Sequence, residues 1–186
     1  MTELHNLPKG LWFVDQYNRM IRWYQRFQTI NNGVLISPGI AEYQYDEILV
    51  FFIFCHHLRD WIIQDTTVNK SHPNYKKFKL LKSKISDFIK NNDCMCLCAD
   101  ICNSAKHKHL DKSSNYYEET SVRFVGVHLI ETPRGKLYKP KWEILTDSGK
   151  RYDLFEVATE CKTKWFEFLE SQEMQIRELI PFWQEN

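Results

Sequence analysis

The first half of the chain repeats apolar side chains at steps of three and four residues, which is the spacing of one helix face. Four such segments predict helices over residues 12–30, 42–64, 75–89 and 94–106. Stretches containing Asn, Gly or Pro separate most of the segments and are typical of helix ends and loops. The second segment is apolar on most sides, so we expect it to be the central helix of the domain.

The spacing of the apolar residues changes from 3.6 to 2 near residue 121. Residues 122–129, 142–146 and 151–154 favour strands, residues 147–150 form a hairpin signal, and a final long helix is expected over 155–180. The fold class predicted is mainly α. We expect one domain over 1–186: an antiparallel four- to five-helix bundle with a small antiparallel β-hairpin or meander, residues 121–154, inserted before the last helix.

Composition narrows the class of protein further. Hydrophobic residues make up 43% of the 186 residues and aromatic residues 15%, which is enough for a packed core. The 25 Lys and Arg against 24 Asp and Glu give a net charge of +1, so no global basic field drives nucleic-acid binding. We see no signal peptide, and the longest apolar run, 48–55, is too short to cross a bilayer. We expect a cytoplasmic protein with reduced cysteines and no membrane partner.

Two of the predicted helices carry polar side chains where a plain core would have Leu or Ala. The second has His56, His57, Arg59 and Asp60, and the fourth has Asp100, Asn103, Lys106 and His107. If the two helices are neighbours, these groups form a pocket. A histidine there could act as general acid or base, and Arg59 or Lys106 could stabilise a negatively charged group of a substrate. The alternative is a buried network that fixes helix register, with Arg59 paired to Asp60 or Asp100.

Four of the six cysteines lie in the predicted fourth helix, at positions 94, 96, 98 and 102. One rigid helix can offer a tetrahedral zinc ion two ligands but not three or four, so packing of small buried cysteines explains the pattern better than zinc. A reactive Cys–His pair is a further alternative. We therefore predict neither a metal nor an organic cofactor.

The β-insert mixes aromatic and basic residues. It contains Tyr138, Trp142 and Tyr152 near Arg134, Lys136, Lys139, Lys141 and Arg151. This combination suits contact with single-stranded nucleic acid. The alternative is an ordinary hairpin whose aromatic side chains pack on the helices and whose lysines are solvated.

The segment from Cys102 to His107 resembles the signature of HEPN domains (higher eukaryotes and prokaryotes nucleotide-binding). These are small helical bundles, many of them metal-independent ribonucleases of toxin and defence systems. Their motif is Arg, a polar residue such as Asn, three variable residues and His. Asn103 and His107 match, whereas Cys102 stands in place of the phosphate-binding Arg. Either Lys106 or Arg59 supplies that charge, or the activity is absent.

The resemblance implies roles for the polar residues and a homodimer that joins two motifs. His107 would be the general acid or base, Asn103 would position the phosphate, and Asp60 or Asp100 would orient a histidine. The order of segments also resembles uncharacterised bacterial helical proteins with a His-Leu-x-Asp-Trp segment, here 57–61, and an Asn-x-x-Lys-His segment, here 103–107. The sequence thus predicts a ribonuclease or RNA-binding protein. The alternative is a non-catalytic accessory protein that binds a partner from the same defence operon.

Overall fold

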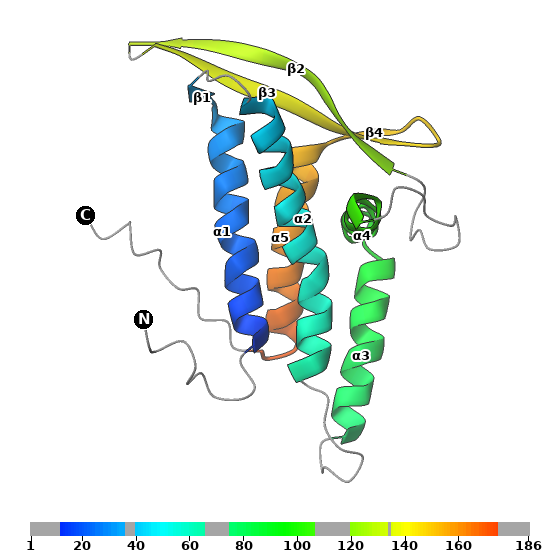
Figure 1. The fold of residues 1–186 in the computed structure, drawn as a ribbon. Helices are drawn as coiled ribbons and strands as arrows, with labels where there is room; N and C mark the ends of the chain where they lie inside the picture. The colour runs from blue at the N-terminus through cyan, green and yellow to red at the C-terminus, as the bar shows by residue number, and fades with distance from the viewer. Residues whose placement is uncertain (1–11, 36–39, 66–74, 107–119, 134, 175–186) are drawn as a thin grey trace, which may run out of the picture.

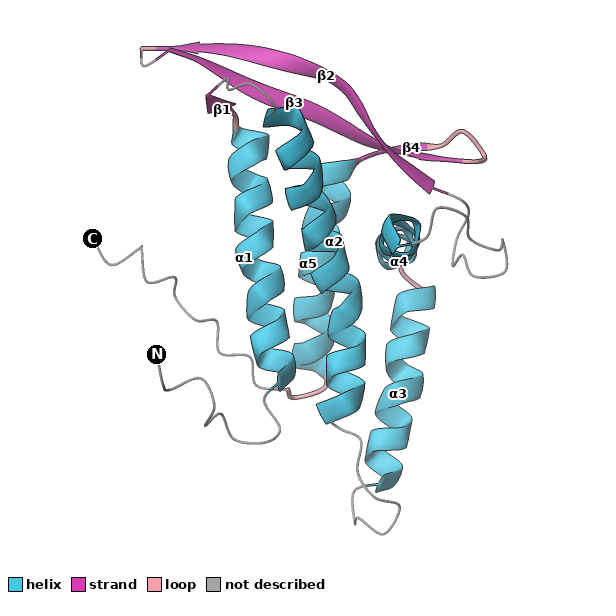
Figure 2. Ribbon diagram, in the orientation of Figure 1, coloured by secondary structure: helices cyan, strands magenta, loops and turns pink. Residues whose placement is uncertain are grey.

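The computed structural model describes residues 12–35, 40–65, 75–106, 120–133 and 135–174 (Figure 1). The helices are α1 (Trp12–Asn32), α2 (Ile40–Asp65), α3 (Tyr75–Lys90), α4 (Asp93–Lys106) and α5 (Leu154–Ser171). The strands are β1 (Val34–Leu35), β2 (Thr120–Thr132), β3 (Gly135–Thr146) and β4 (Arg151–Asp153). The prediction of a mainly α protein with a small antiparallel sheet before the last helix is confirmed (Figure 2).

Helices α1, α2 and α5 lie alongside one another, and the sheet crosses one end of this group (Figure 1). Helix α4 packs against both α2 and α5. Helix α3, which precedes α4 in the chain, lies beside α2 on the side away from α1. The second and fourth predicted helices are therefore neighbours, which was the condition for a shared pocket. It follows that side chains from α2, α4 and α5 meet inside the protein.

Large apolar side chains from these helices fill the core. Fully buried examples are Tyr17, Met20, Phe51, Phe52, Leu58 and Trp165. Each such side chain contributes about 1.5–3 kcal/mol through burial. Two hydrogen bonds tie α5 to the earlier helices: Trp165 Nε1 donates to Cys55 O at 3.0 Å, and the hydroxyls of Tyr24 and Thr159 lie 3.0 Å apart.

The sheet has the order β1–β3–β2, with β4 also paired to β3, and all pairs are antiparallel. Strands β2 and β3 are longer than predicted, because residues 135–141 are strand rather than turn and loop. The Lys-Pro-Lys sequence around Pro140 obscured this part of β3. Proline cannot donate to a ladder and is tolerated at sheet edges. Here one side of β3 pairs with β1 only at 137–138 and with β4 only at 143–145, which leaves residues 139–142 as such an edge in the described chain.

Two further predictions were wrong in detail. Residues 34–35, expected to be loop, form β1 after Gly33, whose φ of 104° suits glycine. Helix α5 ends at Ser171 rather than at 180, and residues 175–180 lie outside the described part. Glu173 adopts the left-handed conformation (φ 57°), its N–H bonds Glu170 O, and Met174 N–H bonds Leu169 O. This is a Schellman cap without the usual glycine, so no glycine marks the end of the helix in the sequence.

Candidate functional site

The polar residues predicted on α2 lie on two sides of that helix. Arg59, Asp60 and Ile63 line a groove together with Lys82 and Ser86 of α3. Trp61 instead packs against Trp12 of α1, with ring centroids 6.3 Å apart. His57 lies one turn before Trp61 on the same helix face. Arg59 and Asp60 therefore face α3, whereas Trp61 faces α1.

Burial also divides the predicted site residues. Asp100 has no exposed surface and His56 is 5% exposed, whereas Asn103 is half-buried. Asp100 and His56 both have interaction partners. Solvent-borne phosphate cannot reach a carboxylate with no exposed surface. Asp100 and His56 are therefore enclosed by the fold, whereas Asn103 is partly open to solvent.

Arg59 bonds Asp60, with Nε 3.0 Å from Oδ1, which is one of the two pairings expected for a structural network. The Asp60 side chain is 56% exposed, so the pair lies at the surface. An exposed pair of this kind is worth about 0–1 kcal/mol. The side chain of Lys106 and the whole of His107 lie outside the residues that the structure describes. The structure therefore does not place the histidine of the motif.

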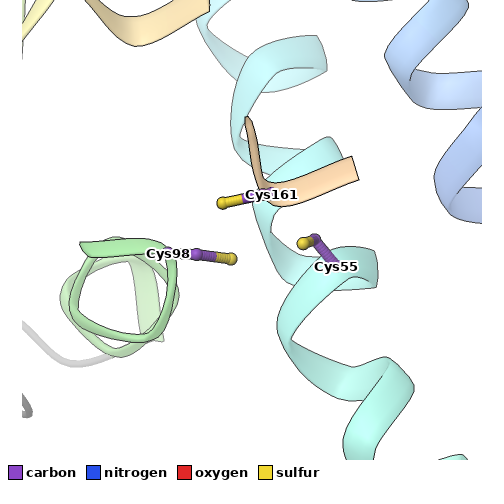
Figure 3. A group of neighbouring side chains, drawn as sticks. All are labelled: Cys55, Cys98 and Cys161. Atoms are coloured by element: carbon purple, nitrogen blue, oxygen red, sulfur yellow. The ribbon is translucent and has the colours of Figure 1, made fainter. Parts of the chain in front are cut away.

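Three cysteines from different helices meet in the core (Figure 3). Cys55 of α2, Cys98 of α4 and Cys161 of α5 are fully buried, and their Sγ atoms all lie within 4.8 Å of one another. We call this group the cysteine triad. Cys98 Sγ is 3.6 Å from Phe52 O, and Cys161 Sγ is 3.2 Å from Cys94 O, so both thiols can donate to carbonyls.

The environment of the triad shifts its thiol pKa values in opposite directions. Burial raises the pKa of Cys98 and of Cys161 well above the ordinary value, because a thiolate loses its hydration there. Burial also opposes ionisation of Cys55, but hydrogen bonding to the Cys161 and Cys98 thiols and to Trp165 lowers its pKa to about 5. The triad is thus a set of soft sulfur donors.

A pocket of about 480 Å³ lies along the edge of β3 that faces away from β2, between the short stretches paired with β1 and β4. The end of α1, the start of α5 and the middle of β3 form its walls. Its lining residues include Phe27, Ile30, Asn31, His128, Lys139, Pro140, Lys141, Trp142, Asp153, Phe155 and Glu156. We call it the sheet-edge pocket, and its volume is that of an ordinary small-ligand site.

Aromatic contacts hold two rings of the pocket wall in place. Phe155 stacks on Tyr24 at 5.8 Å and meets Phe27 edge-on at 5.2 Å. Trp142 contacts Tyr45 at 5.5 Å and Phe124 at 5.3 Å. The buried Nε1 of Trp142 has no hydrogen-bond partner among the described residues. Two rings of the pocket wall are thus held by packing against neighbouring aromatic side chains.

Charged groups of both signs surround these walls. Lys141 Nζ is 3.5 Å from Glu143, which also receives Arg151 at 3.7 Å. Asp153 is the N-cap of α5 and accepts hydrogen bonds from the N–H groups of residues 155 and 156 at 2.9 and 3.0 Å. The Asp153 carboxylate therefore already caps the N-terminus of α5 and neutralises the positive end of the helix dipole. Lys139 and Lys141 are the two lysines that line the pocket; Lys141 already has Glu143 as an ion-pair partner, and the exposed Glu156 opposes an anion there.

Sequence reasoning found part of the pocket and missed the triad. The basic–aromatic β-insert pointed to Lys139, Lys141 and Trp142, but not to the walls from α1 and α5, because sequence does not show which helix ends meet a sheet edge. For the triad, Cys55 and Cys161 occupy core positions of their helices. That pattern shows burial, but only the helix packing shows that they meet Cys98.

Comparison of the chain with protein-family models, with curated proteins and with solved structures gives no match. Among the described helices, none has a stretch that is long and apolar enough to cross a membrane. The function therefore has to be argued from the sites themselves.

Proposed function

We propose that this protein binds single-stranded RNA and seats one nucleotide in the sheet-edge pocket. The observation that carries this proposal is the pairing of aromatic walls, Trp142 and Phe155, with Lys139 and Lys141 around one pocket. Bases stack on aromatic rings and phosphates attract lysines, which is how sequence-tolerant single-strand binding works. The near-neutral net charge fits contact through one local site rather than through a global field.

Fluorescence anisotropy with a labelled single-stranded RNA tests this proposal. Replacing both pocket lysines (Lys139→Gln with Lys141→Gln) should weaken binding and lower the slope of log K against log salt by about 1.4, since each lost phosphate contact is worth about 0.7. Glu156→Gln should strengthen binding, because it removes the opposing charge. The matched control is Lys136→Gln with Lys150→Gln, two exposed lysines that do not line the pocket.

Weaker binding by the pocket variant but not by the control variant distinguishes a specific site from general charge attraction, because general attraction would respond to the loss of any exposed lysine. If the control weakens binding as much as the pocket variant, the pocket is not the contact surface. Absence of binding by the folded wild type at low salt would end the proposal. Circular dichroism of each variant shows whether the fold is intact.

The ribonuclease activity implied by the HEPN resemblance stays a prediction. It is supported by Asn103, which is half-buried near the end of α4 and one turn before His107 in sequence. The burial of Asp100 and His56 supports a structural role for those two residues. Incubating the same RNA in EDTA with wild type and with His107→Ala tests the activity. Cleavage by wild type alone would support it, and cleavage by neither would leave binding as the function.

A protein partner, either a second copy or a product of the same operon, is the second candidate. It is supported by β2, which is the free edge of the described sheet and exposes Phe124, Val125, Val127 and Leu129. Exposed apolar edge strands pair readily with other chains. Light scattering after size exclusion should give a dimer mass if the partner is a second copy. If wild type is a monomer and Val127→Glu has the same mass, the protein does not self-associate through this edge.

A further inference from the structure

We propose that the cysteine triad, Cys55, Cys98 and Cys161, binds one thiophilic metal ion, with Cu(I) the best fit. Nothing in the RNA-binding proposal depends on this site, because the two sites share no residue. The chain would then carry a metal in its helical core as well as a ligand pocket at the sheet edge.

The distances suit a shared ion. A metal–sulfur bond is about 2.3 Å, so three sulfurs around one ion in a plane lie about 4 Å apart. The Sγ atoms of the triad already lie within 4.8 Å of one another, and the three side chains converge on a common point (Figure 3). Small rotations of the side chains would close the remaining gap.

The three ligands come from three different helices, and this answers the argument against a metal that was made from the sequence. A single helix cannot surround an ion with three of its own cysteines. The triad draws one sulfur from each of α2, α4 and α5, so the ion is approached from three directions. Cys94 and Cys102, which share α4 with Cys98, are not members of the group.

The number of ligands favours Cu(I) over Zn(II). The metal-ligating group formed by described residues has three thiols and no histidine or carboxylate. Structural zinc is almost always four-coordinate, and iron–sulfur clusters also take four protein ligands. Cu(I) is soft, prefers thiolates and accepts three of them without a fourth ligand. A three-sulfur set is therefore complete for Cu(I) and one ligand short for Zn(II).

Proton balance gives the binding step. Each ligating cysteine releases its thiol proton to solvent, and the metal–sulfur bonds replace the contacts that Cys98 and Cys161 make with Phe52 O and Cys94 O. The copper enters and stays as Cu(I), so no electron is transferred. Because the triad is fully buried, the ion must enter during folding or through local opening of the core. Once bound, it links three helices and stabilises the folded state.

The test is an anaerobic titration of the full chain with Cu(I) in competition with a chromophoric Cu(I) chelator. Wild type should bind one ion per chain, and Cys55→Ala, Cys98→Ala and Cys161→Ala should each lose that binding. Cys96→Ala and Cys102→Ala are matched controls, because both residues are buried on α4 outside the triad and should leave the stoichiometry unchanged. A parallel Zn(II) titration should show weaker binding.

Two readouts keep the proposal falsifiable if a variant folds poorly. Cu(I) should raise the melting temperature of wild type and of the controls but not of triad variants that circular dichroism shows to be folded. X-ray absorption of copper-loaded wild type should show three sulfur neighbours. No binding by wild type, equal loss in the controls, or fewer than three sulfurs would overturn the Cu(I) site. Tighter binding of Zn(II) than of Cu(I) would overturn the choice of ion.

Discussion

The helical core around α2 and the sheet edge both carry chemically capable side chains, but they differ in how far solvent can reach those side chains. In the core, polar and sulfur groups such as Asp100, His56 and Cys98 are enclosed by packed helices. At the sheet edge, Lys139 and Lys141 border a pocket that is open to solvent. The comparison teaches that chemical capability and access are separate properties. A cluster of reactive residue types in a sequence indicates a site only when the fold leaves a route to it.

The largest expected effect concerns the core itself, where Trp165 of α5 is fully buried and donates to Cys55 O. Trp165→Ala should lower the free energy of unfolding by about 3–5 kcal/mol, through lost packing and an unfilled cavity. Urea denaturation measures it. The control is Phe166→Ala, whose side chain is 38% exposed and should cost less than about 1 kcal/mol. Similar losses for the two variants would mean that α5 does not bury the face described.

The next effect separates a structural carboxylate from an accessible one. Asp100→Ala should destabilise the protein by about 2–3 kcal/mol, because it removes the interactions of a carboxylate that has no exposed surface. Asp60→Ala removes only an exposed pair with Arg59 and should cost less than about 1 kcal/mol. Thermal and urea unfolding give both values. If Asp100→Ala kept full stability but lost RNA cleavage, the buried Asp100 carboxylate would have a catalytic role instead of a structural one.

The smallest effect has the opposite sign. Gln44 is 2% exposed, and neither its Nε2 nor its Oε1 has a partner among the described residues. An unsatisfied buried amide costs about 1–3 kcal/mol, so Gln44→Met, which keeps the volume and removes the polar atoms, should stabilise the fold by about 1 kcal/mol. A rise in melting temperature is the measurement. Destabilisation would show that Gln44 bonds a water or a ligand. The region around Gln44 would then be a second site that small molecules can reach, beside the sheet-edge pocket.

The sequence was sufficient for the helices because their apolar spacing is regular. It placed α1 to α4 within a few residues and identified α2 as the central helix, which contacts each of the other four described helices. It failed where tertiary pairing overrides local signal. Strand β1 exists only because it pairs with Tyr138 and Leu137, and β3 runs through Pro140 because that stretch is an edge. The candidate sites depend in the same way on contacts between distant segments.

The position of α5 in the chain bears on how the protein is made. Its Trp165 bonds a carbonyl 110 residues earlier, and its Thr159 bonds Tyr24 across 135 residues. At about 5–20 residues per second, a ribosome needs roughly 5–20 s to bring α5 out after α2. During that interval the apolar side of α2 that α5 covers stays exposed on the nascent chain. The contacts of α5 that complete the core around α2 therefore form only late in translation.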